Sequence, residues 1–459
     1  MKSVSIVLSA FVSVAGCTTD DSLIDDEDLS TTESDLGVNQ LPNNLPMLNT
    51  LGWSETFSIE GKVNLKNEFF KEFGTNDRTC GSCHKATEGW TINTLNTRIL
   101  FELTGGKDPL FRTNDGSNNP HADVSTVAKR RKAYSMLLNR GTIRVGIPMP
   151  AGAPFELIAV DDPYNFASAQ ELSLFRRPLP AANLTAIPNV MWDGRVTGAT
   201  IHDALKEQAN GATQGHAARP TPLNDATRQK IVDFEMGLFN AQAYTWGIGH
   251  LDAKGAGGGA ATLASQNIEF TTTIPTRDER RWSLFDAWKN SNDPQRRAVY
   301  RGQELFNTRH HQVDANGNPR PEFTCTNCHT AQNFGTDIAG RFFNILDPVN
   351  KPLRRAPDQP LYTFRYNGPP ILNAAGDVVT PTGTIVKITD PGRALITGRW
   401  QDMGRFKVPS MRGLAARAPY FHDGSAATLR ELVKQYEQFQ DFNFTDAEEL
   451  DLVAFLSAL

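Results

Sequence analysis

Two copies of one short motif, Cys-x-x-Cys-His, are the residues in this sequence most able to do chemistry. They are Cys80-Gly81-Ser82-Cys83-His84 and Cys325-Thr326-Asn327-Cys328-His329. Two thiols separated by two residues can form thioethers with the two vinyl groups of one porphyrin, and the adjacent histidine can ligate its iron. The sequence therefore predicts two covalently bound c-type haems, with His84 and His329 as iron ligands.

Paired cysteines also occur in zinc sites and in thiol redox motifs. A Cys₄ zinc site would need both pairs, but these begin at Cys80 and Cys325, and each pair is followed by a histidine. A thioredoxin-like pair needs no such histidine. Both alternatives are weaker than haem attachment.

The N-terminus has the order of an export signal. Lys2 precedes a mostly apolar stretch that ends in Val14-Ala15-Gly16-Cys17, too short to span a bilayer. These four residues resemble the lipobox of bacterial lipoproteins, which implies a signal peptide over residues 1–16 and a lipid on Cys17. The protein would then face the periplasm, anchored to a bacterial membrane, with the outer membrane favoured. An ordinary secretory signal with an incidental cysteine is the alternative.

An acidic segment follows the signal. Residues 18–40 hold eight acidic and no basic residues, which predicts a solvated, disordered tether over residues 17–50. The whole chain has a net charge of −5, of which residues 1–40 carry −7, so residues 41–459 carry +2. This balance argues against a broad phosphate-binding face, and we expect no nucleic-acid partner.

The elements around the motifs predict a repeated architecture. A helix-compatible segment over residues 62–73 precedes the first motif, and a similar one over residues 297–306 precedes the second. The Gly/Ala-rich stretch 254–262 is the best linker, which gives an N-terminal haem domain over residues 51–262 and a C-terminal haem domain over residues 263–459.

The remaining patterns complete the expected fold. Residues 142–148 and 155–160 flank a Pro/Gly-rich turn and predict a short β-hairpin. Capping boxes at Thr428–Glu431 and Thr445–Glu448 predict the starts of two helices near the C-terminus. The predicted fold class is mainly α, with two cytochrome c-like haem domains, long loops and a small β-hairpin.

Several strings in order along the chain resemble the bacterial di-haem cytochrome c peroxidases and the related MauG-type enzymes. They are Met191-Trp192-Asp193-Gly194-Arg195, Leu205-Lys206-Glu207-Gln208-Ala209, Phe406-Lys407-Val408-Pro409-Ser410-Met411-Arg412 and Pro419-Tyr420-Phe421-His422-Asp423-Gly424.

The resemblance implies a division of labour between the two haems. The reactive haem belongs to the N-terminal domain, the electron-transfer haem to the C-terminal one, and Trp192 is the candidate relay between them. It further implies peroxide or O₂ as oxidant, a small redox protein (a cytochrome c or cupredoxin) as electron donor, a calcium ion between the domains, and a homodimer. A tryptophan that only packs in the domain interface is the plain alternative for Trp192.

The proton-transferring group of the peroxidases is missing at its expected place. The family uses a glutamate about ten residues after the glutamine of the Leu-x-x-Gln-Ala string, and counting from Gln208 reaches Ala218. His216 lies two residues earlier, and an imidazole can do the same work near neutral pH. His216 is therefore the catalytic candidate, with a surface-loop histidine as the alternative.

The C-terminal haem needs a sixth ligand, and the sequence offers several. The peroxidases of the family use a methionine where MauG-type enzymes have a tyrosine, and the matching residue is Tyr436. A tyrosinate lowers the redox potential, whereas methionine raises it. Tyr436 also fits an apolar helical stripe as a plain core residue. Met403, Met411 and His422 remain competitors, and His121 is a further candidate at the reactive haem or a solvated loop residue.

These observations predict a di-haem c-type oxidoreductase. In one version it reduces peroxide; in a MauG-like version it uses peroxide or O₂ to oxidise a substrate. The absent glutamate and Tyr436 favour the second version, and overall similarity favours the first. A non-catalytic di-haem electron carrier is the alternative from another functional class.

Overall fold

The computed structural model describes residues 39–266, 268, 276–310, 324–337, 339–344, 357–440 and 442–459. The predicted signal peptide, Cys17 and residues 17–38 of the predicted tether lie outside the described residues. Residues 39–50 are not part of a tether, because strands β1 (Gln40–Pro42) and β2 (Met47–Asn49) lie there and Met47 is buried. No helix in the described part of the chain is long and apolar enough to cross a membrane.

The fold is mixed rather than mainly α, with 33% helix and 18% strand. The described residues contain ten α-helices, which are α1 (Thr94–Thr104), α2 (Val127–Ala133), α3 (Ser135–Arg140), α4 (Ile201–Gly215), α5 (Asp225–Met236), α6 (Ala260–Ser265), α7 (Pro294–Thr308), α8 (Ala394–Thr397), α9 (Leu429–Gln440) and α10 (Asp446–Ser457). The longest helices begin at clear caps: Thr200 precedes α4, Asp293 and Pro294 start α7, and Thr445 precedes α10.

The strands form several small antiparallel sheets. Beyond β1 and β2 they are β3 (Gly52–Ser58), β4 (Lys62–Asn64), β5 (Ile143–Ile147), β6 (Phe155–Asp161), β7 (Leu172–Arg176), β8 (Leu238–Thr245), β9 (Gly249–His250), β10 (Phe342–Phe343), β11 (Leu361–Tyr366), β12 (Ile371–Leu372), β13 (Val378–Thr380), β14 (Ile385–Ile388) and β15 (Phe406–Lys407). The two larger sheets have the orders β2-β3-β8-β9 and β14-β11-β6.

The predicted hairpin between residues 142–148 and 155–160 is wrong. Both strands exist, but β5 pairs with β7, and β6 pairs with β11 from the other end of the chain. Pro148, Pro150 and Pro154 lie between β5 and β6, and prolines supply no N–H to a ladder. The two strands therefore separate and find partners elsewhere.

The helix predicted over residues 62–73 is also wrong, whereas the other helix predictions are confirmed. Residues 62–64 form β4, and a 3-10 turn follows at Glu68–Phe70. Val63 and Leu65 are buried on alternate residues, which is the spacing of a strand. The predicted segment 297–306 lies within α7, and the capping boxes at Thr428 and Thr445 start α9 and α10.

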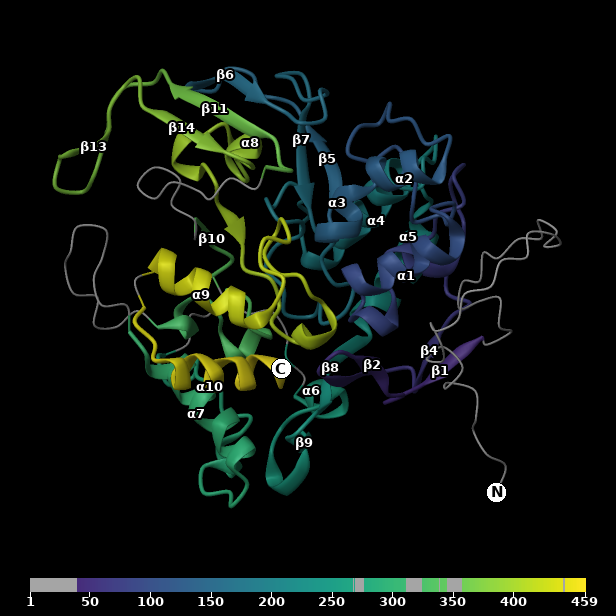
Figure 1. The fold of residues 1–459 in the computed structure, drawn as a ribbon, viewed down its shortest axis with the longest axis vertical. Coiled ribbons are helices and arrows are strands. Elements are labelled where there is room, and N and C mark those ends of the chain that lie inside the picture. The colour runs from purple at the N-terminus through teal and green to yellow at the C-terminus, as the bar shows by residue number, and fades with distance from the viewer. Residues whose placement is uncertain are drawn as a thin grey trace.

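The first and second halves of the chain are interlocked. Strand β6 from the first half pairs with β11 from the second, in one sheet with β14 (Figure 1), with Tyr362 opposite Val160 and Phe364 opposite Leu157. The Gly/Ala-rich segment proposed as a linker is packed, because Ala260 and Leu263 of α6 are buried against β8. No solvated linker therefore separates the halves at this point.

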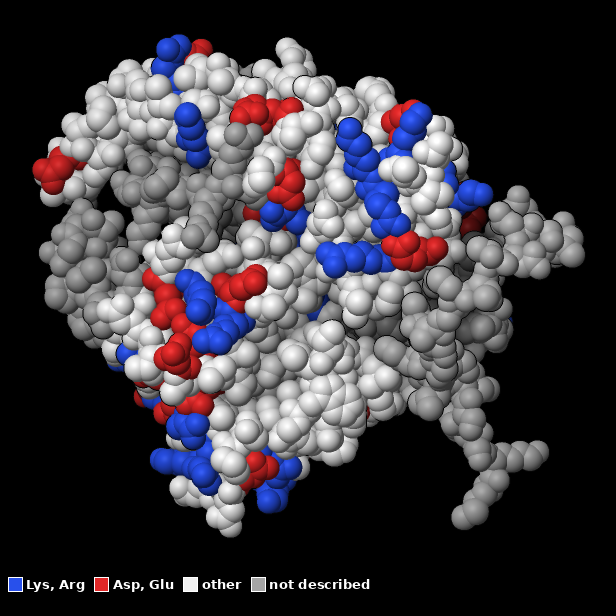
Figure 2. Space-filling model, in the orientation of Figure 1, with Lys and Arg blue, Asp and Glu red and all other residues white. Residues whose placement is uncertain are grey.

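Helices α7 and α10 build the core of the C-terminal half and lie side by side (Figure 1). Their contact is close because Gly302 of α7 faces the backbone of Asp451, where a Cβ atom would lie 1.9 Å from the carbonyl oxygen. Buried Phe306 and Phe455 meet across the contact, with ring centroids 5.5 Å apart. On the surface over α9 and α10, acidic and basic side chains are mixed (Figure 2).

Candidate functional site

The two Cys-x-x-Cys-His motifs adopt the same local structure. Cys80–Ser82 and Cys325–Asn327 each form a 3-10 turn. The residue before the second cysteine locks the turn: Ser82 Oγ accepts a hydrogen bond from Thr79 N–H at 3.0 Å, and Asn327 Oδ1 accepts one from Thr324 N–H at 2.8 Å. The repeat predicted from the sequence is thus confirmed at the motifs themselves.

Each motif histidine is held in the orientation that a haem ligand requires. A backbone carbonyl lies 2.9 Å from Nδ1 of His84, at Trp90, and 2.8 Å from Nδ1 of His329, at Gly335. This contact directs Nε2 away from the backbone and fixes the tautomer. Burial lowers the pKa of His84 to about 4 and also lowers that of His329, so both rings are neutral.

Each motif opens into its own cavity. The N-terminal cavity, about 170 Å³, is lined by Cys80, Cys83 and His84 together with Gln208 and His216. The C-terminal cavity, about 350 Å³, is mostly apolar and is lined by Cys325, Cys328 and His329 together with Met411 and Tyr436.

The residues of both cavities fit a covalently bound haem. The four motif thiols are free and half-buried, and desolvation raises their pKa, to about 11 for Cys83 and about 12 for Cys328. Three buried cations line the cavities and form no salt bridge among the described residues: Arg177, Lys407 and Arg417. Their charges suit the propionates of a porphyrin.

A metal ion bound by side chains alone fits the described residues less well than a haem does. In the described ranges, no three His, Cys, Asp or Glu side chains come together as a metal cluster. This finding disfavours the Cys₄ zinc alternative. The calcium ion implied by the resemblance stays a prediction.

Trp192 lies where the two cavities meet. Its side chain lines both of them, and its Nε1 donates a hydrogen bond to Arg177 O at 2.8 Å. Its carbonyl accepts from the backbone N–H of Lys407 at 2.8 Å. The structure therefore places Trp192 at the boundary between the two cavities.

Trp192 and His422 occupy equivalent positions in two turns of the same shape. Each turn is closed by an antiparallel bridge, with a left-handed residue before the ring and a left-handed glycine two residues after it. The two rings meet with centroids 6.2 Å apart. The internal repeat therefore extends beyond the haem motifs to the contact between the halves.

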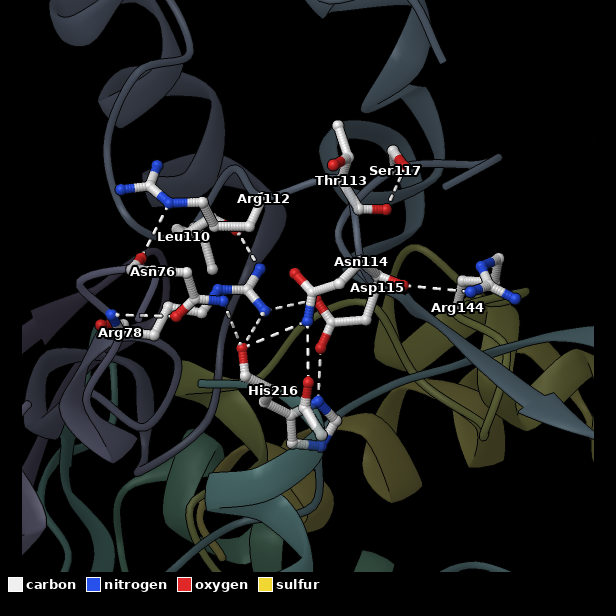
Figure 3. Close-up of polar contacts among 12 residues, drawn as sticks. Asn76, Arg78, Leu110, Arg112, Thr113, Asn114, Asp115, Ser117, Arg144 and His216 are labelled. Atoms are coloured by element: carbon white, nitrogen blue, oxygen red, sulfur yellow. Dashed lines mark hydrogen bonds and ion pairs between the residues drawn. The ribbon is translucent and has the colours of Figure 1, made fainter. Parts of the chain in front are cut away.

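His216 is not a free loop residue. It ends α4 and lines the N-terminal cavity. Its Nδ1 contacts Asp115, and its carbonyl accepts hydrogen bonds from Asn76 at 2.8 Å and from Asn114 at 3.2 Å (Figure 3). The contact at Nδ1 fixes the ring of His216. Its Nε2 makes no such contact with Asp115 and can act in the cavity.

Asp115 and Arg78 support His216, and both were missed from the sequence. Asp115 forms an ion pair with Arg78, and both side chains are buried. Burial alone would raise the pKa of Asp115, but Arg78 and His216 outweigh it and lower the pKa. Asp115 therefore stays ionised and holds the imidazole of His216 through its Nδ1. Arg78 lies in the string Gly74–Thr79, which also resembles the di-haem peroxidases, but no role was predicted for it, and Asp115 lies in no such string.

Tyr436 of α9 faces His329 across the C-terminal cavity. Its hydroxyl lies 3.4 Å from His329 Nε2, and burial raises its pKa. Of the competitors, Met411 and His422 line the same cavity, and His422 also stacks on Phe406 with centroids 3.9 Å apart. Met403 instead packs in the core beneath β11 and β14. His121 is exposed and lies outside the lining of either cavity.

Known proteins resemble this chain over short segments of sequence. No protein-family model matches the chain. The chain is 42% identical over 69 residues to cytochrome c551 peroxidase of Nitrosomonas europaea, which is 15% of this chain and 21% of that protein. It is also 37% identical over 65 residues to the methylamine utilization protein MauG of Methylophilus methylotrophus, which is 12% and 19%. Over these segments the chain is similar to cytochrome c peroxidases and to MauG.

A third match is longer. The cytochrome-c peroxidase IdrP2 of Denitromonas iodatirespirans is 30% identical over 146 residues, which is 29% of this chain and 35% of that peroxidase. The matched segments therefore span about a fifth to a third of the length of these relatives.

Glu235 is a further residue of the N-terminal cavity without an assigned role. The resemblance to di-haem peroxidases and MauG includes no function for it. Its carboxyl is buried, Oε2 has no hydrogen-bond partner, and burial raises its pKa to about 8. It lies on α5, near Cys80. The carboxyl is therefore mostly protonated at neutral pH.

Tyr436→Phe is expected to change the spin state of one haem and leave the other unaltered. The variant keeps the ring and removes only the oxygen that faces His329. Electron paramagnetic resonance of the ferric protein measures both haems at once. Tyr420→Phe is the control, because Tyr420 lines the same cavity but its hydroxyl donates to Leu414 O. Identical spectra for Tyr436→Phe and the unaltered protein would exclude Tyr436 as a ligand.

Proposed function

We propose that the protein is a di-haem c-type oxidoreductase of the peroxidase type. One haem would be held by Cys80, Cys83 and His84, and a second by Cys325, Cys328 and His329. The observation that carries this proposal is that two motif-lined cavities meet at Trp192. Two redox centres that share one oxidisable side chain are suited to electron transfer between them.

The N-terminal cavity is the proposed site of reaction with peroxide. A haem held there by Cys80, Cys83 and His84 would supply the iron chemistry for peroxide reduction. His216, whose Nδ1 is held by Asp115, would move a proton from one peroxide oxygen to the other, so that the second oxygen leaves as water. Asp115 offsets the positive charge that His216 carries in between, and Arg78 keeps Asp115 ionised.

The C-terminal cavity is the proposed entry point for electrons. A small redox protein, a cytochrome c or cupredoxin, would donate them. The contact of Tyr436 with His329 favours the MauG-like version, in which peroxide or O₂ is used to oxidise an organic or protein substrate. An oxygen ligand stabilises the oxidised iron and makes this haem a weaker electron acceptor.

The wider organisation is part of the same proposal. Each Cys-x-x-Cys-His motif with its cavity forms one cytochrome c-like haem unit, and the two units interlock through the sheet β14-β11-β6. The chain is anchored by a lipid on Cys17, facing the periplasm. Haem is attached to such motifs outside the cytoplasm, which supports the same compartment as the export signal. Mass spectrometry of the mature N-terminus tests the anchor, with an acylated Cys17 as the expected species.

Optical and electron paramagnetic resonance spectra of the ferric and half-reduced protein test the proposed activity. Addition of hydrogen peroxide is expected to alter the spectrum of one haem, and a donor cytochrome is then oxidised. If every haem signal is low-spin and neither peroxide nor a small ligand changes it, the protein is a non-catalytic electron carrier. Rapid donor oxidation indicates the peroxidase version, whereas slow donor oxidation with substrate oxidation indicates the MauG-like one.

A further inference from the structure

Lys407 is a buried cation in an unusual position. It lies on β15, is 7% exposed, and lines both the N-terminal and the C-terminal cavity. Its Nζ donates a hydrogen bond to Asn189 O at 2.9 Å. An ammonium group has three donors, and the described residues supply no other acceptor and no ion-pair partner for it.

Burying a charge without a partner destabilises the folded protein. A buried lysine of this kind is therefore expected where a bound ligand supplies the opposite charge. Burial lowers the pKa of Lys407 to about 8, which still leaves the side chain mostly charged at neutral pH. Asn189 O offers a single carbonyl dipole. The missing partner must therefore be an anion that reaches Lys407 from within the cavities.

Arg177 extends the same positive region. It also lines both cavities, and its guanidinium donates to backbone carbonyls, at 2.7 Å to Ile92 O and 2.8 Å to Arg417 O. No acidic side chain among the described residues forms an ion pair with it. Trp192 is held between these two residues, because Arg177 O accepts from its indole and its carbonyl accepts from Lys407 N–H.

We propose that Lys407, together with Arg177, is a carboxylate site shared by the two cavities, which binds propionates of both haems and thereby couples both redox potentials to one side chain. This inference rests on the proposed function in one respect, that two haems are bound. It does not depend on reaction with peroxide.

The sign of the effect follows from electrostatics. A positive charge near an iron centre stabilises the reduced state, which is one charge less positive, and so raises the potential. The same charge opposes removal of an electron from Trp192, and bound propionates would offset it there. Removing the charge of Lys407 should therefore lower both haem potentials together.

The test is a spectroelectrochemical titration of the full-length di-haem protein with Lys407→Met. Both midpoint potentials are expected to shift downwards, whereas Lys407→Arg, which keeps the charge, should restore them largely. Lys387→Met is the matched control, because Lys387 is an exposed lysine on β14 and should shift neither potential. The haem content of each variant is measured alongside.

Three results would overturn the proposal. The first is a shift of one potential only, which would confine Lys407 to one haem, and the second is no shift at normal haem content. The third is a dependence of the unaltered protein's potentials on the identity of the added anion at constant ionic strength, which would assign the site to an exogenous anion.

A loading defect is also informative. If the Lys407→Met variant does not load both haems, the titration is repeated with Lys407→Gln. The glutamine amide can still donate a hydrogen bond to Asn189 O but carries no charge. Failure of both with normal loading of Lys407→Arg supports a requirement for charge. Failure of all three indicates that Lys407 acts only through packing. If Lys407→Met lowers both potentials as expected but the unaltered protein does not react with peroxide, the proposed activity is refuted. The inference about Lys407 is then still supported.

Discussion

Replacing His216 with alanine is expected to slow the reaction with hydrogen peroxide by about 10²–10⁴-fold, the usual contribution of a positioned acid–base group. The loss follows because His216 lines the N-terminal cavity with one nitrogen tied to Asp115. Haem content should be unchanged, since no motif residue is altered. Stopped-flow absorbance after mixing with peroxide measures the rate.

His202→Ala is the control for this experiment. His202 belongs to the same helix, α4, but lies near the surface, contacts Asp233 and lines neither cavity. It should leave the rate unchanged. An unaltered rate in His216→Ala as well would mean that His216 is structural and that proton transfer runs through another group.

The second large effect is expected on stability, from Arg176→Met. Arg176 is 2% exposed and forms ion pairs with Asp193 and with Asp390, the latter through two hydrogen bonds of 2.6 and 2.9 Å. Burial alone would lower the pKa of Arg176, but the two carboxylates outweigh it and raise the pKa. Removing the guanidinium leaves both carboxylates buried without this partner, which costs about 3–5 kcal/mol.

Denaturant unfolding of the di-haem protein measures this loss as a lower midpoint. Arg365→Met is the matched control, because Arg365 also contacts a carboxylate, Glu156, but at an exposed position. The unfolding midpoint of Arg365→Met should be the same as that of the unaltered protein within experimental error. Equal midpoints for both variants would show that the Arg176 network does not stabilise the fold.

The haem motifs could be predicted from the sequence because their chemistry is local. Two thiols and a histidine within five residues specify the turn, the orientation of the histidine and the group they suit. Tyr436 and Trp192 were found by resemblance, and the structure places both at the cavities.

Other parts depend on contacts between distant residues and could not be predicted. Asp115 and His216 are 101 residues apart, and only the folded chain brings them together. The partners of β5 and β6 also could not be predicted. An alternating pattern predicts that a segment is a strand, but it does not predict which other strand pairs with it. The segment 62–73 was mistaken for a helix because its few apolar residues fit both periodicities.

The sheet β14-β11-β6 has a consequence for biogenesis. Strand β6 ends at Asp161, whereas its partner β11 begins at Leu361, so the ribosome completes β6 some 200 residues before its partner exists. Until then β6 presents a bare edge to any other extended chain. The N-terminal half is therefore a poor candidate for separate expression. During synthesis, the cell must protect β6 from aggregation until β11 has been made.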